Sequence, residues 1–159
     1  MLGSRMSISQ RPSGRKEWSS TPNRKIDILA IVKILLVEDS KFLRMATDRA
    51  LTTAGYEVIS ASDGEQALEL AREHLPTLIL LDVMLPKMTG PDVMRVLKND
   101  PTTAAIPVMM LTGLSQKNAK KLEKDGASGF FENSDSMLRE GPESLLASVD
   151  RILKALPRQ

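Results

Sequence analysis

Four polar residues that each follow a short apolar run are the part of this chain best suited to chemistry. They are Glu38, Asp39, Asp82 and Thr112. The runs before them cover residues 33–37, 78–81 and 106–111, and such runs are typical of buried strands in a parallel sheet. Because parallel strands open into one crevice at their carboxyl ends, we expect the four side chains to line a single acidic pocket.

Such a pocket favours phosphate chemistry with a bound cation. Neighbouring carboxylates repel one another, so a cluster of three persists only when a cation compensates their charge. A site of oxygen ligands that keeps its water suits Mg²⁺, which takes one or two carboxylates together with phosphate oxygens. A carboxylate can also attack phosphorus, and Asp82, on the middle one of the three strands, is our candidate nucleophile. Thr112 can donate a hydrogen bond to a phosphoryl oxygen, and Gly113 leaves space for that group.

Other catalytic patterns do not fit the sequence. It contains no glycine-rich phosphate loop of the Walker type and no Ser/His/Asp arrangement. A phosphatase of the haloacid dehalogenase type uses a strand-end aspartate, but it needs a second aspartate two residues later. After Asp39 and Asp82 those positions hold Lys41 and Met84, so we reject this reading. His74, alone near the end of a predicted helix, is interpreted as structural.

The alternation of apolar runs with stretches of helical period predicts five strand–helix units. We expect strands at residues 33–37, 56–60, 77–81, 106–111 and 129–131. We expect helices at about 40–54 and 63–75, around 93–97, and at 116–124 and 142–156. Right-handed crossovers then give an α/β fold, a three-layer αβα sandwich with the flavodoxin-like strand order 2-1-3-4-5. This order places the first and third strands beside the switch point where such folds bind ligands.

Length and composition agree with one globular domain. The chain has 159 residues, of which 42% are apolar and 26% charged, enough for a full core. It contains no cysteine, which excludes disulfides and thiolate chemistry. The longest apolar stretch, residues 26–37, is interrupted by charges and too short for a membrane span, and the start lacks a signal peptide. We therefore expect a cytoplasmic protein without membrane contact.

The positive charge is concentrated at the start of the chain. Residues 1–32 carry six basic and two acidic residues, a net charge of +4, so the remainder carries −2. These basic residues are scattered rather than massed on a predicted helix, so we do not expect nucleic acid as a partner. Residues 7–23 are rich in Ser, Pro, Gly and Arg. We expect residues 1–31 to form a disordered basic extension and residues 32–157 to form the folded domain.

Four motifs in a fixed order give the chain a family resemblance. They read VEDS at 37–40, LDVMLPKMTG at 81–90, PVMMLTG at 107–113 and GASGF at 126–130. Together these motifs resemble the receiver domain of two-component response regulators, over about residues 33–156. The resemblance implies a signal-transduction protein that works in a phosphorelay. Because the sequence ends soon after the last predicted helix, we expect the single-domain type, and whether an output domain is missing is left open. The resemblance also implies a phosphoacceptor that assists its own phosphorylation and dephosphorylation, and not a dedicated enzyme.

The resemblance further implies a role for each residue of the pocket. Asp82 would be the phosphoacceptor that forms the aspartyl phosphate. Glu38 and Asp39 would be the acidic pair that holds Mg²⁺, with Asp82 and the backbone carbonyl of Met84 as further ligands.

Two further residues resemble the switch of the family, and a third departs from its pattern. Thr112 would be the switch hydroxyl, and Phe130 the switch aromatic that rotates inward with it. Family members usually carry a lysine followed by a proline where this sequence has Asn133 and Ser134. A neutral amide cannot supply the positive charge of the lysine. We therefore expect an atypical receiver that depends more strongly on Mg²⁺ for charge compensation. We also expect phosphorylation to be coupled more weakly to its output face.

The partners follow from the same resemblance. The phosphodonor would be a histidine kinase or a phosphotransfer protein, and a downstream protein would bind the face formed by the fourth helix, the fifth strand and the fifth helix. A homodimer through that face is left open. The alternative, motivated by Asn133, is a pseudo-receiver that acts as a protein-interaction module without phosphorylation.

Overall fold

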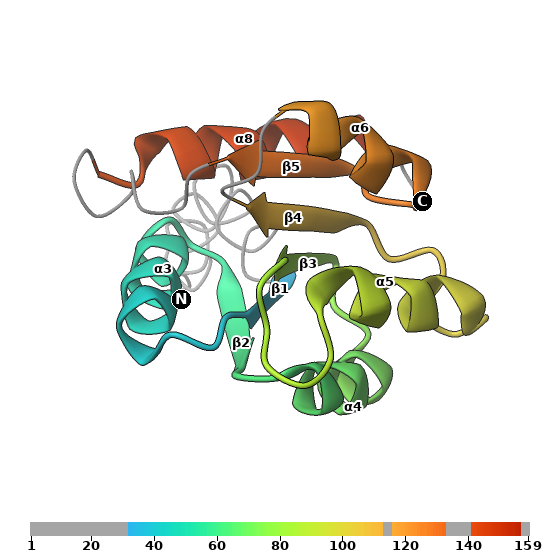
Figure 1. Cartoon of the computed structure of the whole chain (residues 1–159). Helices are drawn as coiled ribbons and strands as arrows, with labels where there is room; N and C mark the ends of the chain where they lie inside the picture. Colours follow the sequence, from blue (N-terminus) through green and yellow to red (C-terminus); the bar gives the residue numbers. More distant parts are fainter. Residues whose placement is uncertain (1–31, 113–115, 133–140, 157–159) are drawn as a thin grey trace, which may run out of the picture.

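The computed structural model describes residues 32–112, 116–132 and 141–156, and they build one parallel sheet with helices on both faces (Figure 1). The strands are β1 Lys33–Val37, β2 Glu57–Ala61, β3 Leu78–Asp82, β4 Val108–Thr112 and β5 Gly129–Glu132. They are hydrogen-bonded in the order β2-β1-β3-β4-β5, and all four pairings are parallel. The expected flavodoxin-like order is thereby confirmed.

Five helices connect or follow these strands. They are α3 Lys41–Thr53, α4 Gly64–His74, α5 Gly90–Asn99, α6 Gln116–Lys124 and α8 Glu143–Ala155. Three of them begin at a side-chain cap that the sequence supplies. Ser40, Asp63 and Thr89 each accept a hydrogen bond from a backbone N–H of the first helical turn. These caps fix the residue at which each of the three helices begins.

Alternate residues of the strands face two different apolar clusters, as the period of a strand requires. In β1, Leu35 and Val37 face the cluster that is covered by α4, α5 and α6, whereas Ile34 and Leu36 face the cluster covered by α3 and α8. The central strands are therefore buried on both sides, which accounts for their nearly continuous apolar sequence.

The predicted boundaries differ from the observed ones mainly at β4. The strand was expected from residue 106, but it begins at Val108. The N–H of Ile106 donates to the carbonyl of Thr103 at 3.0 Å in a turn, and Pro107 has no N–H to give to the sheet. In the part of the chain that the structure describes, no helix combines the length and apolar character needed to cross a membrane.

Candidate functional site

The loop between β1 and α3 places Glu38 inside the protein and Asp39 at its surface. The Glu38 side chain is only 3% exposed, and its Oε2 accepts a hydrogen bond of 3.0 Å from the N–H of Ser40. Asp39 is exposed. Ser40 then caps α3, with its hydroxyl oxygen accepting from the N–H of Leu43 at 3.3 Å. The two neighbouring carboxylates thus occupy different environments before any ligand is considered.

Arg44 braces this loop, a role that the sequence alone did not suggest. Its Nη1 donates to the carbonyl oxygen of Glu38 at 2.8 Å and to that of Asp39 at 3.3 Å. A basic residue one turn into the helix that follows an acidic pair is the signal that could have found it. The guanidinium holds the backbone of the acidic pair and adds positive charge beside it.

The second loop, between β3 and α5, fixes the carboxylate of Asp82. Asp82 is the last residue of β3, and its Oδ1 accepts a hydrogen bond of 3.1 Å from the N–H of Met84. The next N–H, that of Val83, continues the sheet by donating to Leu111 on the neighbouring strand at 3.0 Å. Met84 is 75% exposed, and its observed contact with Asp82 comes from its backbone N–H.

Gly90 lets the same loop return to the strand. Its N–H donates to the carbonyl of Val83 at 3.0 Å. A Cβ at position 90 would lie 2.8 Å from the Cα of Val83 and would collide with the backbone carbonyl of Asp82. Only glycine permits so close an approach between two backbones. The packing of α5 against the end of β3 is therefore tied to the position of Asp82.

Glu38 and Asp82 meet, and their charges are strongly linked. Burial raises the pKa of Glu38 to about 7, helped by the negative charge of Asp82 and opposed by the hydrogen bond from Ser40. Burial also raises the pKa of Asp82, although the hydrogen bond from Met84 opposes this. The interaction between the two carboxyl groups raises the pKa of Glu38 and lowers that of Asp82, whereas the charge of Asp39 raises both. This edge of the sheet therefore holds more negative charge than its surroundings readily accept.

The donor groups at this edge of the sheet fit a hard cation. Glu38, Asp39 and Asp82 offer carboxylate oxygens and Met84 offers a carbonyl, which are the ligands that Mg²⁺ prefers. Among the described residues, no group of three or more acidic, histidine or cysteine side chains converges as a ready-made metal cage. Mg²⁺ commonly keeps several water molecules and uses one or two carboxylates, so a complete protein cage is not required. The assignment of these four residues to a metal stays a prediction.

The other predicted residues lie on β4 and β5. Thr112 ends β4 beside the strand of Asp82, and its side chain is 3% exposed. Phe130 lies on β5 opposite Met110 and packs, half-buried, against the cluster under α4, α5 and α6. Asn133 lies outside the described residues. The structure therefore brings the acidic residues to one edge of the sheet, with Thr112 at the end of the adjacent strand.

Comparisons with known proteins identify the same region. Residues 34–134 match the family model of the response regulator receiver domain. The polar-differentiation response regulator DivK of Brucella anthropi is 37% identical over 108 residues, which are 67% of this chain and 87% of DivK. The response regulator PleD of Caulobacter vibrioides is 43% identical over 100 residues, which are 62% of this chain.

A solved structure shows the same fold, and some relatives are longer than this chain. The chemotaxis response regulator CheY4 of Vibrio cholerae matches with a TM-score of 0.70 and 31% identity, covering 77% of this chain and 99% of CheY4. By contrast, the matched part spans 22% of PleD and 33% of ycf27 of Porphyra purpurea. With the family model covering most of the folded region, this chain belongs to the response regulator receiver family of two-component signalling.

Proposed function

We propose that Asp82 accepts a phosphoryl group from the phosphohistidine of a histidine kinase or a phosphotransfer protein, in a reaction that depends on Mg²⁺. The observation that carries this proposal is the Glu38–Asp82 pair. Both side chains lie at the carboxyl edge of the sheet, where burial raises the pKa of each carboxyl group and the negative charge of Asp39 raises both further. The protein would act as a cytoplasmic phosphoacceptor, not as a dedicated enzyme, with residues 32–157 as the receiver and residues 1–31 as a basic extension.

The chain's own groups prepare Asp82 for attack. The N–H of Met84 holds Oδ1, which orients the carboxylate. An oxygen of Asp82 then forms a bond to phosphorus while the bond from phosphorus to the histidine nitrogen breaks, and the imidazole leaves with the electron pair. When bound, Mg²⁺ supplies charge compensation for the carboxylates and the phosphoryl oxygens. Glu38, Asp39, Asp82 and the carbonyl of Met84 would hold it.

The switch would follow from the residues on β4 and β5. In this proposal the hydroxyl of Thr112 donates to a phosphoryl oxygen, and Phe130 turns further inward. The response reaches a downstream partner through the surface formed by α6, β5 and α8, which could also pair two copies of the chain. Asn133 in place of lysine removes one fixed cation, so we expect a weaker response at this surface.

Intact-mass spectrometry after incubation with acetyl phosphate and Mg²⁺ tests the chemistry. We expect the mass of one phosphoryl group to be added, and the addition to disappear in Asp82→Asn. The matched control is Asp63→Asn, because Asp63 caps α4 and asparagine caps a helix about equally well. An unchanged mass of the wild-type protein with Mg²⁺ present would contradict the proposal.

The pseudo-receiver is the second candidate, and Asn133 is the observation that favours it. It predicts that a partner binds equally well to the wild type and to Asp82→Ala, with or without a phosphodonor. The variant Asn133→Lys separates chemistry from signalling. If it leaves phosphate uptake unchanged and strengthens the conformational response, the missing lysine affects the switch and not the transfer of the phosphoryl group.

A further inference from the structure

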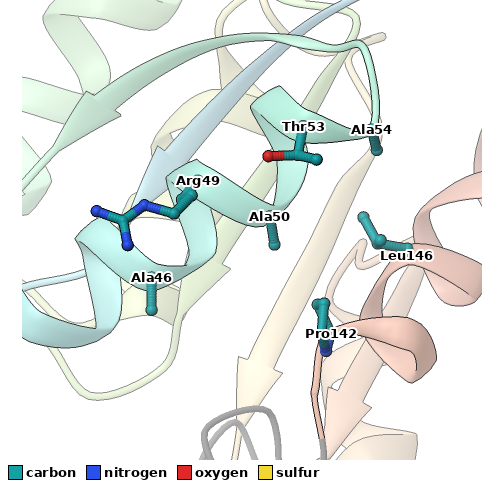
Figure 2. Close-up of a pocket in the computed structure, with 7 residues that line it drawn as sticks. All are labelled: Ala46, Arg49, Ala50, Thr53, Ala54, Pro142 and Leu146. Atoms are coloured by element: carbon teal, nitrogen blue, oxygen red, sulfur yellow. The ribbon is translucent and has the colours of Figure 1, made fainter.

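A groove between α3 and α8 is a second feature of the surface, and its lining includes none of the acidic residues Glu38, Asp39 and Asp82. It has a volume of about 430 Å³. It is lined by residues of α3 and its C-cap, Ala46, Arg49, Ala50, Thr53 and Ala54, and by Pro142 and Leu146 at the start of α8 (Figure 2). The alanines are too short to fill the space between the two helices. Arg49 and Thr53 are the polar side chains among these seven lining residues, and the other five are apolar, so the groove is mainly apolar.

The apolar character continues along α3 toward its start. Phe42 is 71% exposed and Met45 is 52% exposed. Together with Ala46 and Ala50 they follow the spacing of one helical face, three and four residues apart. Two large apolar side chains exposed on one helical face favour a site at which something binds.

The chain enters the domain at one end of this groove. Val32, the first described residue, packs against the same apolar cluster as Ala54 and Leu146, which line the groove. Its carbonyl accepts a hydrogen bond of 3.0 Å from the N–H of Glu57, shortly after α3 has ended. The residues that precede Val32 in the chain therefore start next to the groove.

The segment just before Val32 has the composition that the groove requires. Residues 26–31 read IDILAI, and they differ from the Ser- and Arg-rich residues before them. They can supply four large aliphatic side chains, and Asp27 offers a partner for Arg49. We propose that residues 26–31 of this chain cover the groove between α3 and α8.

The length of the segment agrees with this placement. From Ala46 to Ala54 a helix rises by about 12 Å, at 1.5 Å per residue. Six extended residues reach about 20 Å, so the segment can span the groove from its point of entry. No stretched linker is needed, and the cost in loop closure is small because the segment adjoins Val32 directly. The sequence before the domain would thus be anchored on the helix that follows the Glu38–Asp39 pair.

Cysteine pairs in the full-length protein test the proposal, because the native sequence has no cysteine. The test pairs are Ile28→Cys with Ala50→Cys and Leu29→Cys with Ala50→Cys. We expect at least one of them to form a disulfide within one chain, at least ten times faster than control pairs in which Glu69→Cys replaces Ala50→Cys. Glu69 is exposed on α4, which covers the opposite face of the sheet. Non-reducing electrophoresis and intact mass report the bond.

Three outcomes would overturn the proposal. Disulfide-linked dimers in place of intramolecular bonds would show that a second copy covers the groove. Rates equal to those of the Glu69→Cys pairs would show that the segment does not lie there, and the groove would then be open to another protein. Hydrogen exchange gives an independent measurement. The double variant Ile28→Ser with Ile31→Ser should speed exchange several-fold in residues 46–54 and leave residues 64–74 unchanged, and unchanged exchange in both would also overturn it.

Discussion

The two loops that carry the acidic residues of this protein are built on different principles. Only residues 38–40 separate β1 from α3, whereas residues 83–89 separate β3 from α5. The short loop is held by its own helix, through the cap at Ser40 and the two bonds from Arg44. The long loop is held by its return to the strand, where Gly90 meets the backbone of Asp82 and Val83.

This difference matters for what each loop can tolerate. In the short loop, several local hydrogen bonds position the two carboxylates. A single substitution therefore removes only part of what holds this loop. The long loop places one carboxylate by a contact between backbones, for which no side chain can substitute. We therefore expect the largest losses from changes at the contact of the long loop, and smaller ones from changes to either helix cap.

Gly90→Ala should have the largest effect. The new Cβ would collide with the backbone of Asp82 and Val83, so the loop or the strand must move. We expect a loss of about 3 kcal/mol in the free energy of unfolding, measured by urea denaturation, as for other overpacked sites. The control is Pro91→Ala at the next residue, which should lose less than about 1 kcal/mol. Equal losses in the two variants would mean that the close approach of Gly90 does not matter.

Arg44→Ala tests the brace of the short loop. The carbonyls of Glu38 and Asp39 would lose a charged donor, and the first of these bonds is partly buried. We expect a loss of about 1.5 kcal/mol in the free energy of unfolding. Arg44→Lys should restore only part of the lost stability, because an ammonium group does not have the planar arrangement of N–H donors of a guanidinium. Lys41→Ala, an exposed change in the same helix, should stay within about 0.5 kcal/mol of the wild type.

The sequence was sufficient to predict the strands and the edge of the sheet at which the residues of the candidate site lie. Apolar runs ending at Glu38, Asp82 and Thr112 predicted the strands and this edge. A parallel strand that is buried on both faces is apolar at consecutive positions, so it can be recognised in the sequence. The bonds of Arg44 and the contact of Gly90 were not predicted. Both depend on how far one backbone lies from another, and this distance is set by the packing of α3 and α5 and not by a local pattern.

The sequence predicted that the acidic residues repel one another, but not which of them is buried. Three acidic residues at one edge imply repulsion, and this was anticipated. That Glu38 is buried while Asp39 is exposed does not follow from their order in the chain. It depends on the direction in which the chain leaves β1, where the N–H of Glu38 still donates to Ala61 on β2. The roles of these residues toward a metal stay predictions.

The two helix caps allow a direct comparison of the loops. Thr89 caps α5 in a reciprocal box, in which Asp92 accepts from the N–H of Thr89 at 3.3 Å, while Ser40 caps α3 without such a partner. Thr89→Ala should therefore lose about 1.5 kcal/mol in the free energy of unfolding and Ser40→Ala about 1 kcal/mol. Denaturation of the two single variants in parallel checks the order. A larger loss in Ser40→Ala would contradict it.

The same box predicts a dependence on pH. Hydrogen bonds from the side chain and backbone of Thr89, assisted by Arg95, lower the pKa of Asp92 below its usual value of 3.8. A lowered pKa in the folded state means that the ionised carboxylate stabilises the fold above pH 4 and that this contribution is lost as the pH falls below that value. We expect the difference in stability between the wild type and Thr89→Ala to shrink between pH 5 and pH 2. A difference that stays constant over this range would exclude the ionised form of Asp92 as its cause.

The smallest effect is expected at Lys87, in the middle of the long loop. Its φ of 67° lies in the left-handed region, which costs a non-glycine residue about 1 kcal/mol or more. Lys87→Gly removes this strain but gives the unfolded chain more freedom, so the net gain should be only about 0.5 kcal/mol. Lys87→Val should instead lose about 1 kcal/mol, since a branched side chain tolerates this conformation less well. Opposite signs in urea denaturation of the two variants would show that the long loop keeps a strained turn in order to bring Gly90 back to Asp82, whereas equal and negligible effects would mean that the turn carries no strain.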